Sequence, residues 1–187
     1  MKYLLVFLFS ITLYSQTEMA EVHPPFNFQG LTWDSTKEDV NAKFPESMKI
    51  GKYLSVDTNV NYLDASLIFR FEEGNLNLIM YTFKEKHSNE NIYIEDFLNL
   101  KELLIEKYGE PNLDETEWRR DLYKGDTQYY GLAISMGDLI YKVQWLLPDT
   151  DIRLLLYGDN YKVKHTLAYL KNVEGSKRDR SKTLNKL

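Results

Sequence analysis

The amino-acid sequence predicts an α+β domain in which two helices pack on one face of an antiparallel sheet. Three observations support this prediction. Two segments have apolar residues at helical spacing, several others alternate apolar and polar residues as strands do, and the last connections are too short for crossover helices. The expected order is helix, two strands, helix, four strands. This twofold plan also indicates a degenerate repeat of one helix followed by strands.

The first helix is expected at 36–43. Ser35 and Glu38 have the spacing of a capping box, in which each side chain bonds to the backbone N–H of the other residue. Val40 and Phe44 lie four residues apart and would share the buried side of the helix. The proline after Phe44 disfavours helical geometry at that residue, so the helix should end there.

The second helix has the clearest pattern in the chain. Its apolar residues recur at i, i+4, i+7, i+11 and i+15, and charged residues fill the positions between them. These apolar residues are Tyr93, Phe97, Leu100, Leu104 and Tyr108. Gly109 stands where helices commonly end in a left-handed residue, and Pro111 prevents the helix from restarting.

A hairpin is expected from strands at 67–71 and 76–83, with Gly74 supplying the positive φ that such turns need. Turn-forming residues separate four further strands. They are expected at 128–136, 139–147, 152–157 and 161–170. Residues 112–127 are expected to form a long polar loop that contains Trp118. The side chains predicted to be mostly buried are Val40, Phe69, Ile79, Tyr81, Phe97, Leu100, Leu104, Tyr141, Val143, Leu154 and Leu156.

The N-terminus has the pattern of a secretory signal peptide. Lys2 precedes an apolar run of about ten residues, and Ser15 is a small residue at the expected cleavage site. The run is too short to span a bilayer, which takes about 20 apolar residues. The predicted organisation is a signal peptide at 1–15, a polar leader at 16–25, a single α+β domain at 26–172 and a disordered basic tail at 173–187.

Composition restricts the compartment and the partners. The chain has no cysteine, so it can form neither a disulfide nor the cysteine-based anchor of a lipoprotein. We expect a soluble exported protein, periplasmic or extracellular, with no integral membrane segment after signal cleavage. A net charge of −5 gives no reason to expect nucleic acid as a partner. The 14 tyrosines fit either a β-rich domain or a stacking surface for sugar or peptide.

No catalytic, metal-binding or cofactor-binding pattern stands out in the sequence. His23, His87 and His165 are scattered, whereas a metal site needs several ligands at fixed spacing. His165 lies on the apolar side of the last strand, where we expect a buried or edge histidine bonded to the backbone. There is no G-x-S-x-G nucleophile motif and no phosphate-binding glycine loop. We therefore expect no cofactor, no metal and no enzyme activity.

One cluster around Trp118 is a candidate site. Its acidic members could supply the two carboxylates of a glycosidase, while Trp118 stacks a sugar ring. They are Asp114, Glu115, Glu117 and Asp121. In a chain with 28 acidic residues, such a cluster is also expected as a solvated loop. The candidate ligand-binding residues are Trp118, Arg119 and Arg120.

Two windows resemble known families. The first contains Phe28, Gly30, Leu31, Trp33, Asp34, Ser35, Thr36, Glu38, Asp39 and Val40. It resembles an opening shared by small exported bacterial proteins of unknown function, in which a glycine usually stands at the position of Asp34. The second window, 103–111 followed by Trp118, is similar to the helix, Gly-x-Pro and downstream tryptophan of the BamE/SmpA family and of tandem-repeat β-lactamase-inhibitor-like domains. BamE-type proteins are lipoproteins, and the absent cysteine departs from that pattern. The resemblance implies a non-enzymatic envelope protein that works through its sheet face.

Two classes of function follow from these observations. The first is an exported, non-catalytic binding or accessory protein of the bacterial envelope, whose partner is an unknown envelope protein or a glycan. The alternative is a glycan-acting hydrolase that uses the carboxylates of the 114–121 loop. Two carboxylates about 5–10 Å apart across a cleft, with Trp118 at its edge, would favour the hydrolase.

Overall fold

A computed structural model describes residues 24–172 of the chain. The predicted signal peptide, most of the leader and the basic tail lie outside these residues. The helices are α1 (Lys37–Lys43), α2 (Ile92–Tyr108) and α3 (Tyr130–Ser135), the last preceded by a 3₁₀ turn, η1 (Thr127–Tyr129). The strands are β1 (Met48–Ile50), β2 (Tyr53–Val60), β3 (Leu63–Glu72), β4 (Asn75–Phe83), β5 (Leu113–Trp118), β6 (Leu139–Leu146), β7 (Thr150–Asp159) and β8 (Lys162–Lys171).

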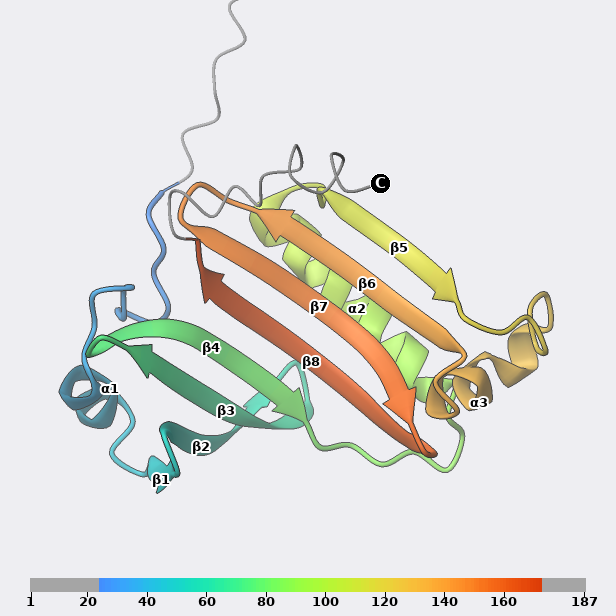
Figure 1. Cartoon of the computed structure of the whole chain (residues 1–187), viewed down its shortest axis with the longest axis horizontal. Coiled ribbons are helices and arrows are strands. Elements are labelled where there is room, and N and C mark those ends of the chain that lie inside the picture. Colours follow the sequence, from blue (N-terminus) through green and yellow to red (C-terminus); the bar gives the residue numbers. More distant parts are fainter. Residues whose placement is uncertain (1–23, 173–187) are drawn as a thin grey trace, which may run out of the picture.

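The strands form a single antiparallel sheet of eight, in the order β1-β2-β3-β4-β8-β7-β6-β5 (Figure 1). The order is symmetric, because two four-stranded meanders meet where β4 pairs with β8. Met80 opposite Ala168 lies at the centre of this seam. Each meander is preceded by a helix, α1 or α2. The prediction of an α+β fold with an antiparallel sheet is therefore confirmed, whereas the predicted order of elements is wrong.

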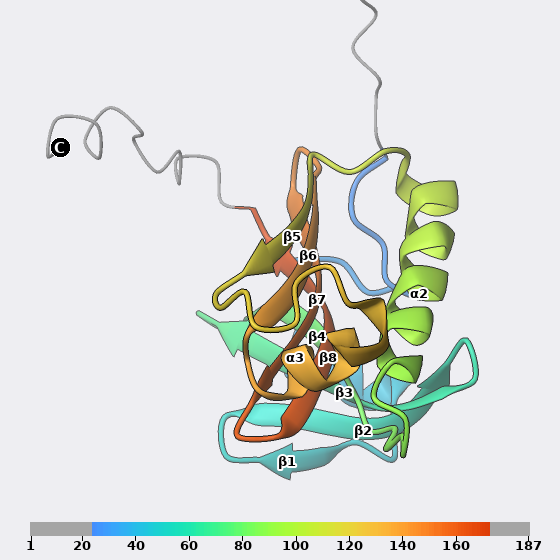
Figure 2. The same ribbon diagram turned by 90° about the vertical axis from the view of Figure 1, so that its right-hand side faces the viewer.

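The helices contribute to one hydrophobic core on one side of the sheet. Figure 2 shows α2 standing on one side of the strands, and its residues Phe97, Leu100 and Leu104 are buried together with Val40 of α1. These side chains pack against inward-facing strand residues such as Phe69 and Leu154, which are 0% exposed. Of the predicted core residues, only Tyr141 is not fully buried.

The first helix begins one residue later than predicted. Thr36 is the N-cap, and its hydroxyl accepts a hydrogen bond from the backbone N–H of Asp39 while the Asp39 carboxylate accepts from the N–H of Thr36. The capping box is thus Thr36 with Asp39, and not Ser35 with Glu38. The hydroxyl of Ser35 instead accepts a bond from the N–H of Thr32 at 3.0 Å, which closes the preceding turn.

The predicted strand at 128–136 is wrong, because these residues form η1 and α3. Contacts made across the fold decide the conformation. The side chain of Asn91 donates to the carbonyl of Thr127 at 3.1 Å, and it accepts from the N–H of Gly131 at 2.7 Å. A Cβ at Gly131 would overlap the backbone of Glu90 and Asn91. The close packing at Gly131 and the hydrogen bonds of the distant Asn91 side chain therefore favour a helix here, although the local sequence alternates as a strand does.

Three strands were not expected. The polar loop predicted at 112–127 begins with β5, whose acidic residues conceal the strand pattern. In the first half, β1 and β2 occupy a region that resembles a polar connection, since Leu54 and Val56 of β2 are buried while Asp57 and Asn59 are exposed. The turn from β2 to β3 also lacks glycine, the residue that usually marks such hairpins.

The segment before α1 links the two halves of the molecule. Trp33 is 5% exposed and stacks on Phe26 with ring centroids 3.9 Å apart. The indole N–H of Trp33 donates to the Thr150 hydroxyl at 3.1 Å, and the backbone N–H of Phe26 donates to the Asp149 carboxylate at 2.8 Å. Trp33 is therefore structural, and it attaches the N-terminal segment to the start of β7.

Candidate functional site

No helix of residues 24–172 covers the face of the sheet opposite the core. Strand register places its side chains in rows that cross the sheet. One row crosses all eight strands through Met48, Ser55, Ile68, Met80, Ala168, Arg153, Gln144 and Leu113. A second row contains Ile50, Tyr53, Arg70, Leu78, Leu170, Asp151 and Leu146. We call this surface the open face.

On the β1–β4 half of the open face, the first two rows are mostly apolar, with Ser55, Tyr53 and Arg70 among them. Met48 and Ile50 of β1 are 65% and 57% exposed, and they continue a partly exposed surface formed by Ile68, Leu78 and Met80. A third row is mostly polar and contains Asp57, Ser66, Thr82, Thr166, Leu155, Lys142 and Glu115. These residues do not stand out individually in the sequence. The alternation of Met48 and Ile50 was the available signal, but β1 is too short for a reliable pattern.

The predicted ligand-binding residues lie around the end of β5. Trp118 is partly buried and meets the ring of Tyr130 edge-on, with centroids 5.1 Å apart. The Arg119 side chain lies 3.5 Å from the carboxylate of Glu117. The Arg120 guanidinium lies 2.5 Å from the carboxylate of Asp138, which is buried. Trp118 is therefore held by α3, and each arginine is paired with a different carboxylate.

The acidic residues of this region are also paired, on two sides of the sheet. Asp114 contacts Lys101 of α2. Glu115 and Glu117 point to the opposite side, as alternate strand residues do, and both approach Lys142. The hydrogen bond from Lys142 is the main cause that lowers the pKa of Glu117. A glycosidase acid needs a raised pKa, so this arrangement does not provide one at Glu117.

The two histidines of the described region have different environments. His165 is 4% exposed, and its Nε2 atom finds no hydrogen-bond partner among residues 24–172. It is thus buried, one of the two expected placements, and its Nε2 atom does not form the expected kind of bond to the backbone. His87 Nε2 lies 2.6 Å from the carboxylate of Asp96. No group of three or more histidine, aspartate or glutamate side chains in the described region is placed to hold a metal ion.

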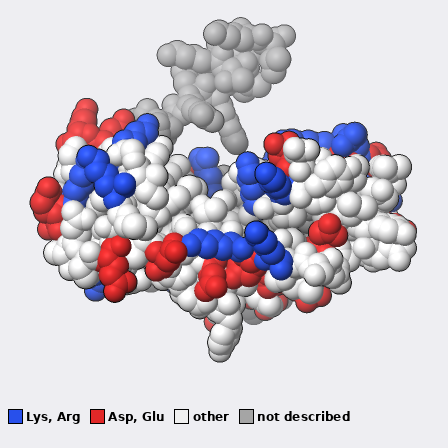
Figure 3. All heavy atoms as spheres, turned by 90° about the horizontal axis from the view of Figure 1, so that it is seen from below, with Lys and Arg blue, Asp and Glu red and all other residues white. Residues whose placement is uncertain are grey.

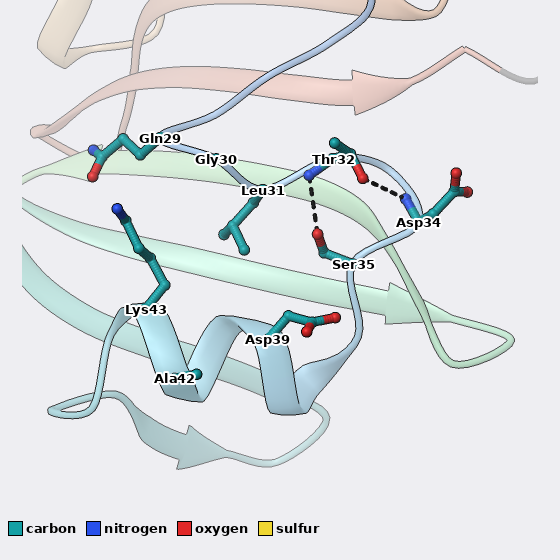
Figure 4. A pocket seen from close by; sticks show the side chains of 9 residues that line it. All are labelled: Gln29, Gly30, Leu31, Thr32, Asp34, Ser35, Asp39, Ala42 and Lys43. Carbon is teal, nitrogen blue, oxygen red and sulfur yellow. Dashed lines mark hydrogen bonds between the residues drawn. The ribbon is translucent and has the colours of Figure 1, made fainter.

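The window at 28–40 contributes to a hollow beside α1. Figure 4 shows Thr32 and Ser35 bonded to each other above the helix, with Asp39 and Lys43 on the helix itself. The hollow has a volume of about 610 Å³ and is widely open. Its turn uses Gly30, which has a φ of 93°. The residues of this window thus form the turn at Gly30, the buried Trp33 and the helix cap at Thr36.

Charges are mixed over the surface. Figure 3 shows acidic and basic side chains interspersed on the side of the molecule seen from below, without an extended area of one sign. Ion pairs such as Lys84 with Asp57, 2.5 Å apart, contribute to this mixture. Within residues 24–172, no helix has the length and apolar character needed to cross a membrane.

Comparison of the chain with family models, with curated proteins and with solved structures finds no match. The two family resemblances therefore stay predictions, and the function has to be argued from the chain itself.

Proposed function

We propose that the protein is an exported, non-catalytic binding or accessory protein of the bacterial envelope that docks a folded protein partner on the apolar half of its open face. The observation that carries the proposal is the sheet of eight strands with its helices on one side. The pattern of a signal peptide in residues 1–15 supports export.

The dimensions of the open face suit a protein partner. With strands about 4.8 Å apart, eight strands span about 38 Å. Three rows of side chains about 7 Å apart add a second dimension of about 20 Å, so the whole face, of which the apolar half is one part, offers about 800 Å². This area is about what one partner contributes to a standard protein–protein interface. The apolar half would form the buried centre of the interface, and the polar row would form its rim.

The ion pairs around β5 support a non-catalytic role. Glu117 and Asp114 are engaged by lysines on opposite sides of the strand, and Trp118 packs against Tyr130. A hydrolase would need two of these carboxylates to face one another across a bound sugar. These contacts therefore favour the non-catalytic role over the hydrolase alternative.

The docking proposal is tested by capturing partners from an envelope extract with the mature protein. The decisive variant replaces Met48 and Ile50 by lysine, because both side chains are exposed and the change places charge on the apolar half. Leu122→Lys is the matched control, since Leu122 is 71% exposed and lies outside the open face. We expect the M48K/I50K protein to lose a partner that wild type and L122K both retain. Capture of the same proteins by all three would contradict docking on this face.

Export is tested separately by mass spectrometry of the secreted or periplasmic protein. Its N-terminus should lie at or near Gln16, after removal of the signal peptide. An exported form that retains Met1 would contradict cleavage at this position.

A further inference from the structure

A cavity of about 600 Å³ lies between the tip of the β2–β3 hairpin and α2. Figure 2 shows this turquoise hairpin reaching toward the side of the sheet on which α2 stands. The hairpin contributes Asn61, Tyr62 and Leu63, the loop after β4 contributes Glu85 and His87, and α2 contributes Asp96, Asn99, Glu102, Leu103 and Glu106. The ion pair between His87 and Asp96 attaches the loop to the helix. The cavity is separate from the open face.

Tyr62 is the unusual residue at this cavity. Its side chain is 94% exposed, and its φ of 68° lies in the left-handed region that tyrosine rarely adopts. The β3–β4 turn has Gly74, with a φ of 88°, at the equivalent second position. Such turns favour glycine, because a left-handed conformation brings a Cβ close to the following carbonyl oxygen. The core does not account for the ring of Tyr62, which is almost fully exposed. Tyr161 holds the equivalent position in the β7–β8 turn, with a φ of 58°, but only Tyr62 lines this cavity.

The lining around Tyr62 has the chemistry of a sugar-binding site. Asn61 and Asn99 carry amides that can both donate and accept hydrogen bonds, and Glu102 and Glu106 carry acceptors. An aromatic ring has a partial negative charge on its face, which attracts the C–H groups on one side of a pyranose ring. A pyranose combines such a C–H face with hydroxyl groups around its edge, so it can use both kinds of lining.

The same lining disfavours two other ligand classes. A protein partner would need a contiguous apolar centre from which water is excluded, but Tyr62 has polar neighbours and only Leu63 and Leu103 are aliphatic. A negatively charged glycan would be repelled by the carboxylates, which outnumber His87, the only basic side chain in the lining. A glycan without negative charge avoids both difficulties.

We infer that this cavity binds an uncharged glycan, with Tyr62 stacking on a pyranose ring and Asn99 hydrogen-bonding its hydroxyl groups. Rings whose substituents are all equatorial, as in glucose and N-acetylglucosamine, present the flattest C–H face to an aromatic side chain. The inference does not depend on the open face, so it can fail while the proposed docking of a protein stands.

The test measures binding of the purified mature protein to the hexasaccharide of β-1,4-linked N-acetylglucosamine by calorimetry, and to insoluble chitin and cellulose by sedimentation. Tyr62→Gly removes the ring while giving the turn a residue that it favours, so the fold should be retained. Tyr62→Phe keeps the ring. Tyr161→Gly is the matched control, because Tyr161 has a φ of 58° in the same kind of turn but does not line the cavity.

We expect Y62G to weaken binding at least tenfold, Y62F and Y161G to bind as wild type does, and Asn99→Ala to weaken binding without lowering the melting temperature. Failure of the wild-type protein to bind the hexasaccharide, chitin and cellulose would overturn the inference. Equal binding by wild type and Y62G would also overturn it, and so would equal losses in Y62G and Y161G.

Discussion

His165 should make the protein less stable in mild acid. Its imidazole packs at a tilt against Phe83 and Phe97, with ring centroids 4.5 and 5.8 Å away, and desolvation lowers its pKa from 6.5 to about 3. Between these two pKa values, His165 is protonated in the unfolded chain and neutral in the folded chain. The stability associated with this group is complete above pH 6.5 and is lost as the pH falls from 6.5 toward 3. At pH 5 the loss is about 2 kcal/mol relative to pH 8.

The assay is urea unfolding of wild type and His165→Leu between pH 8 and pH 5. Leucine suits the apolar surroundings and cannot be protonated, so we expect the variant to gain about 2 kcal/mol relative to wild type as the pH falls to 5. Carboxylates and the other histidines titrate in both proteins, and their contributions cancel in the difference. A difference in unfolding free energy that stays constant from pH 8 to pH 5 would refute the reasoning, because it would show that His165 titrates alike in both states.

Four further substitutions test the packing. Leu104→Ala, on the buried side of α2, should cost about 2–5 kcal/mol in unfolding free energy, and a loss below about 1 kcal/mol would show that another side of the helix is buried. In thermal melts, Trp33→Ala should destabilise by about 3–5 kcal/mol and Trp118→Ala by less, because Trp118 is only partly buried; an equal effect would make Trp118 a core residue. Gly158→Ala should lower the melting temperature sharply, since a Cβ there would overlap the backbone of α3, and an unchanged melt would mean that α3 can move away.

The sequence predicted the helices and hairpins whose structure is specified by residues within the same segment. The spacing from Tyr93 to Tyr108 and the glycine that follows specify α2 without reference to the rest of the chain. The hairpin at Gly74 is similarly local, and its residues Phe69 and Ile79 face one another as expected. These elements follow from short-range periodicity and turn chemistry.

The elements that the sequence did not predict depend on distant residues. Helix α3 needs the Asn91 side chain and the close approach at Gly158, which lie far away in the chain. Strand β5 carries few apolar residues, so the local pattern does not mark it as a strand. Its acidic side chains are paired with Lys101 and Lys142 on neighbouring elements. The open face and the cavity beside Tyr62 are likewise products of strand order, which local patterns do not specify.

The seam between β4 and β8 also bears on how the chain assembles. Within each meander, neighbouring strands are close in the sequence and can pair early, whereas Ile79 must find Tyr169 across much of the chain. A molecule opened at this seam would present two unpaired strand edges that already match each other in register. Two such molecules could exchange halves and recover the same hydrogen bonds, with the connection between β4 and α2 as the hinge. An exchange of halves between two chains would therefore preserve the register of the symmetric sheet.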